Sequence, residues 1–168
     1  MTILEKSIIL PPHYEKAIRS IVTTFSENGF ECYLVGGSVR DLLMGAPACD
    51  FDFATNARPQ QVMKLFKRVI PTGIKHGTVS LLFNDDATYE ITTYRSDGKY
   101  VDGRRPESIS FSDTLEEDVR RRDFTINGLA YDVLKQELID HVGGLDDIGR
   151  GVIRTIGDSI DRFSEDGL

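Results

Sequence analysis

The feature that most constrains this chain is a pair of glycines between a short apolar stretch and a helical pattern. Residues 34–41 read LVGGSVRD. Consecutive glycines end a strand and let the backbone turn into a helix, where backbone N–H groups are free. Ser38 adds a hydroxyl and Arg40 adds a guanidinium, so Gly36, Gly37, Ser38 and Arg40 supply the donors that a polyphosphate needs. We expect an anion-binding turn here; a turn without a ligand is the alternative.

Two carboxylates follow this turn at a spacing that suits a metal. Residues 50–53 read DFDF. In a strand, alternate side chains share a face, so Asp50 and Asp52 would converge while Phe51 and Phe53 enter the core. Hard carboxylate oxygens at this spacing favour a divalent cation such as Mg²⁺. Glu90, on another predicted strand, is the candidate for a third catalytic carboxylate; a solvated charge on the strand face is the alternative.

Hydrophobic periodicity and turn residues predict a mixed α/β organisation. Helices are expected over 14–27, over 39–44, over 59–67 with Thr55 or Asn56 as the cap, over 115–121 with Thr114 or Asp113 as the cap, and from 158 onward. Strands are expected over 32–35, 50–54, 78–83, 88–94, 131–134, 137–141 and 152–156, with 78–83 and 88–94 forming a hairpin and 143–144 a turn.

Composition narrows the class of protein. The hydrophobic fraction of 40% and the charged fraction of 28% are ordinary for a globular protein, and no segment has the roughly 20 apolar residues that cross a bilayer. The N-terminus has no signal-peptide pattern, so the expected location is cytoplasmic. A net charge of −7 argues against indiscriminate nucleic-acid binding. Basic residues nevertheless cluster locally, at 64–68, 104–105 and 120–122.

Three separated motifs together resemble one family. The segments are 34–41, then 50–55 (DFDFAT), then 121–128 (RRDFTING). In this order they are similar to the class II nucleotidyltransferases of the polymerase beta superfamily. That group contains tRNA CCA-adding enzymes, their CC-adding and A-adding specialists, and bacterial poly(A) polymerases. The resemblance implies an α+β head domain with a small, mainly antiparallel sheet flanked by helices.

The resemblance also implies roles for individual residues. It implies that Asp50 and Asp52 hold catalytic Mg²⁺, and that the glycine turn surrounds the triphosphate of CTP or ATP. It further implies that the third motif lies against the nucleotide, through Arg122, Asp123 and Asn127. From residue chemistry alone, a salt-bridge cluster at the start of a helix is an equal alternative for that motif.

Two further stretches are similar to tRNA-type enzymes rather than to poly(A) polymerases. They are 71–79 (PTGIKHGTV) and 94–106 (YRSDGKYVDGRRP). In the family the second stretch is a flexible loop associated with adding the terminal A, and here it carries Arg95, Asp102, Arg104 and Arg105. The alternative for the arginine pair is a solvated loop. The implied partners are CTP, ATP and the tRNA 3′ end, without a membrane; the oligomeric state stays open.

The expected organisation is an N-terminal helical segment (1–30), the nucleotidyltransferase head (31–157) and the start of a helical neck (158–168). In the family, the neck selects the base, so this chain would be a catalytic head fragment. The expected function is transfer of CMP and AMP to the tRNA 3′ end. Alternatives are an A-adding enzyme, a poly(A) polymerase, a nucleotide-binding module without turnover, or a purely structural domain.

Overall fold

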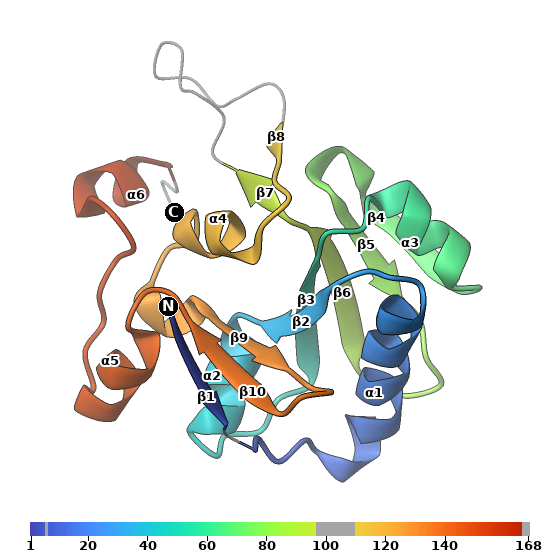
Figure 1. The fold of residues 1–168 in the computed structure, drawn as a ribbon, viewed down its shortest axis with the longest axis horizontal. Helices are drawn as coiled ribbons and strands as arrows, with labels where there is room; N and C mark the ends of the chain where they lie inside the picture. Colours follow the sequence, from blue (N-terminus) through green and yellow to red (C-terminus); the bar gives the residue numbers. More distant parts are fainter. Residues whose placement is uncertain (6, 97–109, 166–168) are drawn as a thin grey trace.

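A single large sheet forms the centre of the molecule in the computed structural model, which describes residues 1–5, 7–96 and 110–165 (Figure 1). Its eight strands run in the order β1-β10-β9-β2-β3-β6-β5-β4. They are β1 (Thr2–Glu5), β2 (Cys32–Val35), β3 (Asp50–Thr55), β4 (Val69–Gly73), β5 (Thr78–Leu81), β6 (Thr88–Thr93), β9 (Leu129–Asp132) and β10 (Glu137–Asp140). Within this sheet β3 and β6 pair in parallel and the other neighbours pair antiparallel.

Helices and two short strands surround the sheet. The helices are α1 (Pro12–Glu27), α2 (Gly37–Leu43), α3 (Pro59–Leu65), α4 (Leu115–Arg120), α5 (Gly144–Arg150) and α6 (Ser159–Glu165), with 3-10 turns η1 (Ile74–His76) and η2 (Thr125–Asn127). A second sheet pairs β7 (Arg95–Ser96) with β8 (Ser110–Phe111). No helix in the described parts of the chain is long and apolar enough to cross a membrane.

The two faces of the large sheet bury different sets of apolar side chains. One face carries Phe51 and Phe53, which pack in the main core with the apolar stripe of α1. The other face is covered in part by α4, whose Leu115 and Val119 pack with Ala54 of β3. Consecutive apolar residues such as Phe53 and Ala54 favour a strand that is buried on both faces, and this end of β3 is buried in that way.

The mixed α+β fold and most of the expected elements are confirmed. The hairpin of β5 and β6 forms as expected. Thr114 caps α4, since its side chain accepts a hydrogen bond from the N–H of Glu117. The helix after the glycine pair begins at Gly37, two residues before the expected start. The strand expected at 131–134 lies at Leu129–Asp132.

Three expectations about the elements were wrong, and strand β4 was not predicted. Residue Arg58, not Thr55 or Asn56, occupies the N-cap position of α3, because Thr55 instead donates its hydroxyl hydrogen bond to the carbonyl of Glu31. The segment that contains Pro71, for which no helix or strand was expected, forms β4 at the sheet edge, where a residue without an N–H is tolerated. After Gly143 the chain forms helix α5 rather than only a turn. Residues 152–156 make only an isolated bridge from Thr155 to Phe124.

The N-terminal segment contributes more than a helix. Strand β1 pairs with β10 and so extends the large sheet, with Thr2 opposite Asp140 and Glu5 opposite Glu137. All four of its residues are exposed, and apolar alternation is too weak there to predict a strand. The division of the chain at 30 and 157 stays a prediction.

Candidate nucleotidyl-transfer site

The two carboxylates of β3 lie on the exposed side of an alternating strand. Asp50 and Asp52 are exposed, whereas the side chains of Phe51 and Phe53 are completely buried. This is the alternation expected from the sequence. Neither carboxylate is hydrogen-bonded or ion-paired to any of the described residues, so their oxygens are free to bind a cation.

Glu90 lies directly beside Asp52. The two residues are register partners in the parallel pair of β3 and β6, so their side chains share a face. Partial burial raises the pKa of Asp52, and the negative charge of Glu90 raises it further, while Arg122 opposes both effects. Among the described residues, no three His, Cys, Asp or Glu side chains are grouped as a metal site. Asp50 and Asp52 stay the predicted donor set of two carboxylates, and Glu90 stays a predicted third catalytic residue.

Gly36 brings the backbone close to this donor set. Its φ of 72° lies in the left-handed region that favours glycine. A Cβ at this position would lie 3.4 Å from Nη1 of Arg122 and 3.4 Å from Oδ2 of Asp52. The turn between β2 and α2, one candidate metal-binding carboxylate and one guanidinium therefore meet at a single point. Positive and negative groups in such proximity suit a bound metal–polyphosphate.

The next residues of the turn differ in what they offer a ligand. Gly37 lies close to Arg40, since a Cβ on Gly37 would be 3.5 Å from the Nη2 atom of Arg40. Ser38 is 4% exposed, and its hydroxyl donates a hydrogen bond of 3.0 Å to the carbonyl of Val35. The hydroxyl of Ser38 thus stabilises the turn and donates within the protein. Binding of the triphosphate by Ser38 stays a prediction, and its backbone N–H is the donor that remains for it.

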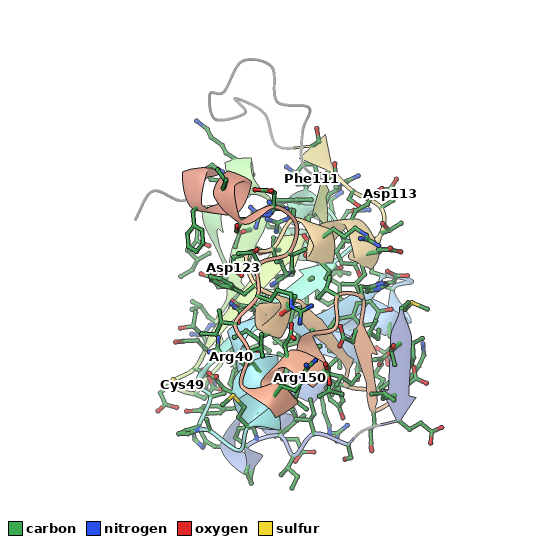
Figure 2. All side chains as sticks on the ribbon, turned by 90° about the vertical axis from the view of Figure 1, so that its left-hand side faces the viewer. Arg40, Cys49, Phe111, Asp113, Asp123 and Arg150 are labelled. Carbon is green, nitrogen blue, oxygen red and sulfur yellow. The ribbon has the colours of Figure 1, made fainter. Side chains whose placement is uncertain are left out.

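Arg40, Asn127 and Asp123 form a hydrogen-bonded chain from α2 to the residues around η2. Nη1 of Arg40 donates to Oδ1 of Asn127 at 2.7 Å, and Nδ2 of Asn127 donates to Oδ1 of Asp123 at 3.2 Å. Arg40 also pairs with Asp41 at 2.8 Å. Figure 2 labels Arg40 and Asp123, which come from elements far apart in the sequence and lie on the same side of the molecule. Carboxylate and amide groups held in this way are suited to bind ribose hydroxyls.

Sequence reasoning missed Asp118, which organises the arginines of the third motif. Its side chain is 1% exposed and pairs with Arg121 and Arg122, each at 3.1 Å. The signal was present, because an acidic residue three and four positions before two arginines on a helix is the spacing of intrahelical ion pairs.

The predicted loop residues are only partly placed by the structure. Arg95 lies in β7, and its backbone N–H donates to Oδ1 of Asp118 at 3.1 Å. Burial, and then the neighbouring charge of Arg121, lower the pKa of Arg95 to about 10. Asp102, Arg104 and Arg105 lie outside the described residues.

Curated relatives and solved structures resemble this chain over nearly its whole length. The chain is 52% identical over 148 residues to a CCA-adding enzyme of Oceanobacillus iheyensis, covering 88% of this chain and 36% of that protein. It is 47% identical over 163 residues to a CCA-adding enzyme of Streptococcus uberis, covering 97% and 40%. The chain therefore spans between about a third and two fifths of the length of these relatives.

Solved structures agree with the fold. The Bacillus stearothermophilus CCA-adding enzyme in complex with CTP matches with a TM-score of 0.82 and 42% identity, over 95% of this chain and 37% of that one. The Thermotoga maritima CCA-adding enzyme complexed with tRNA matches with a TM-score of 0.72 and 26% identity, over 94% and 36%. A family model described as the poly(A) polymerase head domain matches residues 32–154. The chain thus belongs to the family of poly(A) polymerase head domains.

Proposed function

We propose that this chain is the catalytic head of a CCA-adding enzyme, which transfers CMP and AMP from CTP and ATP to the 3′ end of tRNA. The observation that carries the proposal is that the Gly36 turn lies close to both Asp52 and Arg122, with Asp50 two residues before Asp52 on the same strand. The names of the relatives support the substrates, since relatives at 46–52% identity are CCA-adding enzymes. A cytoplasmic location is part of the proposal because nucleotides and tRNA are its substrates.

The donor set fits a divalent metal, and we propose Mg²⁺ held by Asp50 and Asp52. When bound, Mg²⁺ would increase the acidity of the attacking hydroxyl and neutralise charge on the triphosphate. Carboxylate oxygens without protein donors are the ligands that this hard cation prefers. Glu90 adds negative charge beside Asp52, which strengthens attraction of a cation to this face.

The surrounding residues would orient the nucleotide and hold its charge. Arg122 lies where it can contact phosphate oxygens at the Gly36 turn, and Arg40 lies beside Gly37. Asp123 and Asn127 would bind the ribose. Fixed positive groups that meet developing negative charge stabilise a transition state without reorganisation, and an aligned hydroxyl gains from proximity. The 3′ hydroxyl of tRNA would attack the α-phosphate in line, and pyrophosphate would leave.

The test is incorporation of labelled CTP and ATP, supplied separately and together, into tRNA that lacks its 3′ CCA. The complete gene product should add both nucleotides with Mg²⁺ and neither with EDTA. Asp50→Asn and Asp52→Asn should each lower incorporation at least about a thousandfold, since each removes a metal-binding charge. Asp146→Asn, an exposed aspartate of α5 that pairs with Arg150, is the matched control and should retain activity.

The same assay separates the alternatives. Incorporation of ATP alone onto tRNA ending in CC would indicate an A-adding enzyme, and long A tails on any RNA would indicate a poly(A) polymerase. Binding of ATP with Mg²⁺ in calorimetry without incorporation would indicate a nucleotide-binding module. Full activity of Asp50→Asn or Asp52→Asn would overturn the metal assignment.

A further inference from the structure

The carboxylate of Asp118 receives more hydrogen bonds than an ordinary surface ion pair. Oδ1 accepts from Nε of Arg121 at 3.1 Å and from the backbone N–H of Arg95 at 3.1 Å, while Oδ2 accepts from Nη2 of Arg122 at 3.1 Å. The side chain of Asp118 is 1% exposed, so these contacts take place away from water. Charge-assisted hydrogen bonds in such surroundings fix their partners strongly.

The cluster around Asp118 has more positive than negative charge. Two guanidiniums, those of Arg121 and Arg122, pair with this one buried carboxylate, and the charge of the Arg95 guanidinium interacts with all three groups. The Nε atoms of Arg95 and Arg122 are buried and have no hydrogen-bond partner among the described residues. Buried donors without acceptors are costly unless a ligand or water completes them. Positive charge remains after Asp118 is paired, and it is available to an anion.

Arg122 connects this cluster to the candidate active site. Its Nη2 atom contacts Asp118, and its Nη1 atom lies 3.4 Å from the position that a Cβ on Gly36 would occupy. Oδ2 of Asp52 lies at the same distance from that position. Because the guanidinium is a rigid plane, fixing one nitrogen on Asp118 also sets where the other nitrogen points. Asp118 itself forms no hydrogen bond or ion pair with Gly36 or Asp52 among the described contacts, so it can act on the site through Arg122.

We propose that Asp118 is a positioning residue for phosphate binding: it holds Arg122 in the orientation that meets the nucleotide's polyphosphate. Through its bond to the Arg95 N–H, the same carboxylate attaches the start of β7 to α4. The proposal rests on the proposed function for the identity of the anion, and on the contacts above for the role of Asp118.

The kinetic test compares Asp118→Asn with Asp132→Asn in the complete gene product. Asp132, the last residue of β9, is a matched control, because it is also buried and its carboxylate accepts backbone hydrogen bonds, here from the turn after the strand. Asp118→Asn should lower kcat about ten- to hundredfold, since a misplaced group loses transition-state contacts. KM for the nucleotide should also rise, by about threefold to tenfold, because a displaced Arg122 makes a weaker contact with the bound polyphosphate. Asp132→Asn should leave both constants near wild type.

A double-mutant cycle shows whether Asp118 acts through Arg122. Arg122→Lys keeps a positive charge but lacks the planar fork. If Asp118 positions Arg122, adding Asp118→Asn to Arg122→Lys should lower kcat by less than about threefold beyond the single variant. If the two substitutions lower kcat independently, so that their fold-effects multiply in the double variant, the proposal is overturned. Wild-type kcat for Asp118→Asn would also overturn it. Should Asp118→Asn fail to fold, Asp118→Glu keeps the charge and displaces the carboxylate, and wild-type kcat for a folded Asp118→Glu would overturn the proposal.

A measurement without turnover separates this inference from the proposed function. In ¹⁵N NMR, the Nε–H signal of Arg122, assigned by its loss in Arg122→Lys, should shift when sodium tripolyphosphate is added to the wild type. The shift should be lost in Asp118→Asn and kept in Asp132→Asn. A shift without nucleotide incorporation would contradict the proposed function alone. Incorporation together with an unchanged Arg122 signal would contradict the inference alone.

Discussion

The hydroxyl of Thr125 donates a buried hydrogen bond of 2.7 Å to Oδ2 of Asp147, which attaches η2 to α5. The other oxygen of Asp147 accepts from Arg154 at 2.8 Å. Asn127 is the last residue of η2, so this contact also helps to fix the hydrogen bonds that link Arg40, Asn127 and Asp123. Helix α5, which the sequence pattern did not predict, therefore helps to hold the residues that we propose bind the nucleotide.

The backbone contact between α5 and η2 predicts unequal effects of two alanine substitutions in one helix. A Cβ on Gly144 would collide with the carbonyl oxygen of Thr125, whereas a Cβ on Gly149 would meet nothing within 4 Å. Gly144→Ala should lower the free energy of unfolding by about 3 kcal/mol or more. Gly149→Ala should raise it by about 0.5 kcal/mol, because alanine favours the helix. Urea denaturation followed by circular dichroism measures both, and equal effects would contradict the close packing.

Gly36 and Gly45, two glycines with nearly equal positive φ values, distinguish the effect of backbone strain from the effect of close neighbours. Gly36 and Gly45 have φ values of 72° and 73°, but a Cβ would have neighbours within 4 Å only at Gly36. Alanine should cost at least about 1 kcal/mol of stability through backbone strain at either position, and more at Gly36, whose ψ of −145° lies in a region that glycine alone adopts readily. Only Gly36→Ala should also abolish nucleotide incorporation, since its methyl group would enter the space between Arg122 and Asp52. An active, folded Gly36→Ala variant would show that the turn does not approach the phosphates.

The pH dependence of stability should contain a contribution from His141. Its side chain is 6% exposed, and burial lowers its pKa from the ordinary 6.5, although Glu116 at 3.9 Å opposes the effect. The unfolded chain then binds a proton more readily than the folded chain, so stability should fall as pH drops below about 6.5. His141→Gln should reduce this decrease. Urea midpoints between pH 5 and pH 8 measure it, with His13→Gln as the exposed control; identical pH profiles for His141→Gln and the wild type would contradict the prediction.

The sequence was sufficient to predict an element where the chemistry of its side chains and their periodicity favour the same structure. Asp50 and Asp52 alternate with two buried phenylalanines, and only a strand with one buried face satisfies that pattern. The cap at Thr114 was predictable for a similar reason, since a hydroxyl residue followed by acidic residues begins a helix at low cost. Local preference and tertiary packing favour the same conformation at both places.

The remaining elements depend on contacts that the local sequence does not reveal. Strand β1 is exposed on every residue and forms by pairing with β10, and β4 contains a proline that only its edge position allows. Ser38 illustrates the same limit within the site. Its residue type predicts phosphate binding, but its burial beneath the turn directs the hydroxyl to Val35.

The parallel pairing of β3 with β6 has a consequence for how the protein folds and evolves. Asp52 and Glu90 are brought together by a non-local pairing that closes a loop containing α3, β4 and β5, and contacts of this kind slow folding. The pairing then holds two like charges side by side, which destabilises the native state. Neutral variants of either residue should fold more stably and work worse. Under the proposed function, selection for activity would maintain this destabilising pair in the middle of the sheet.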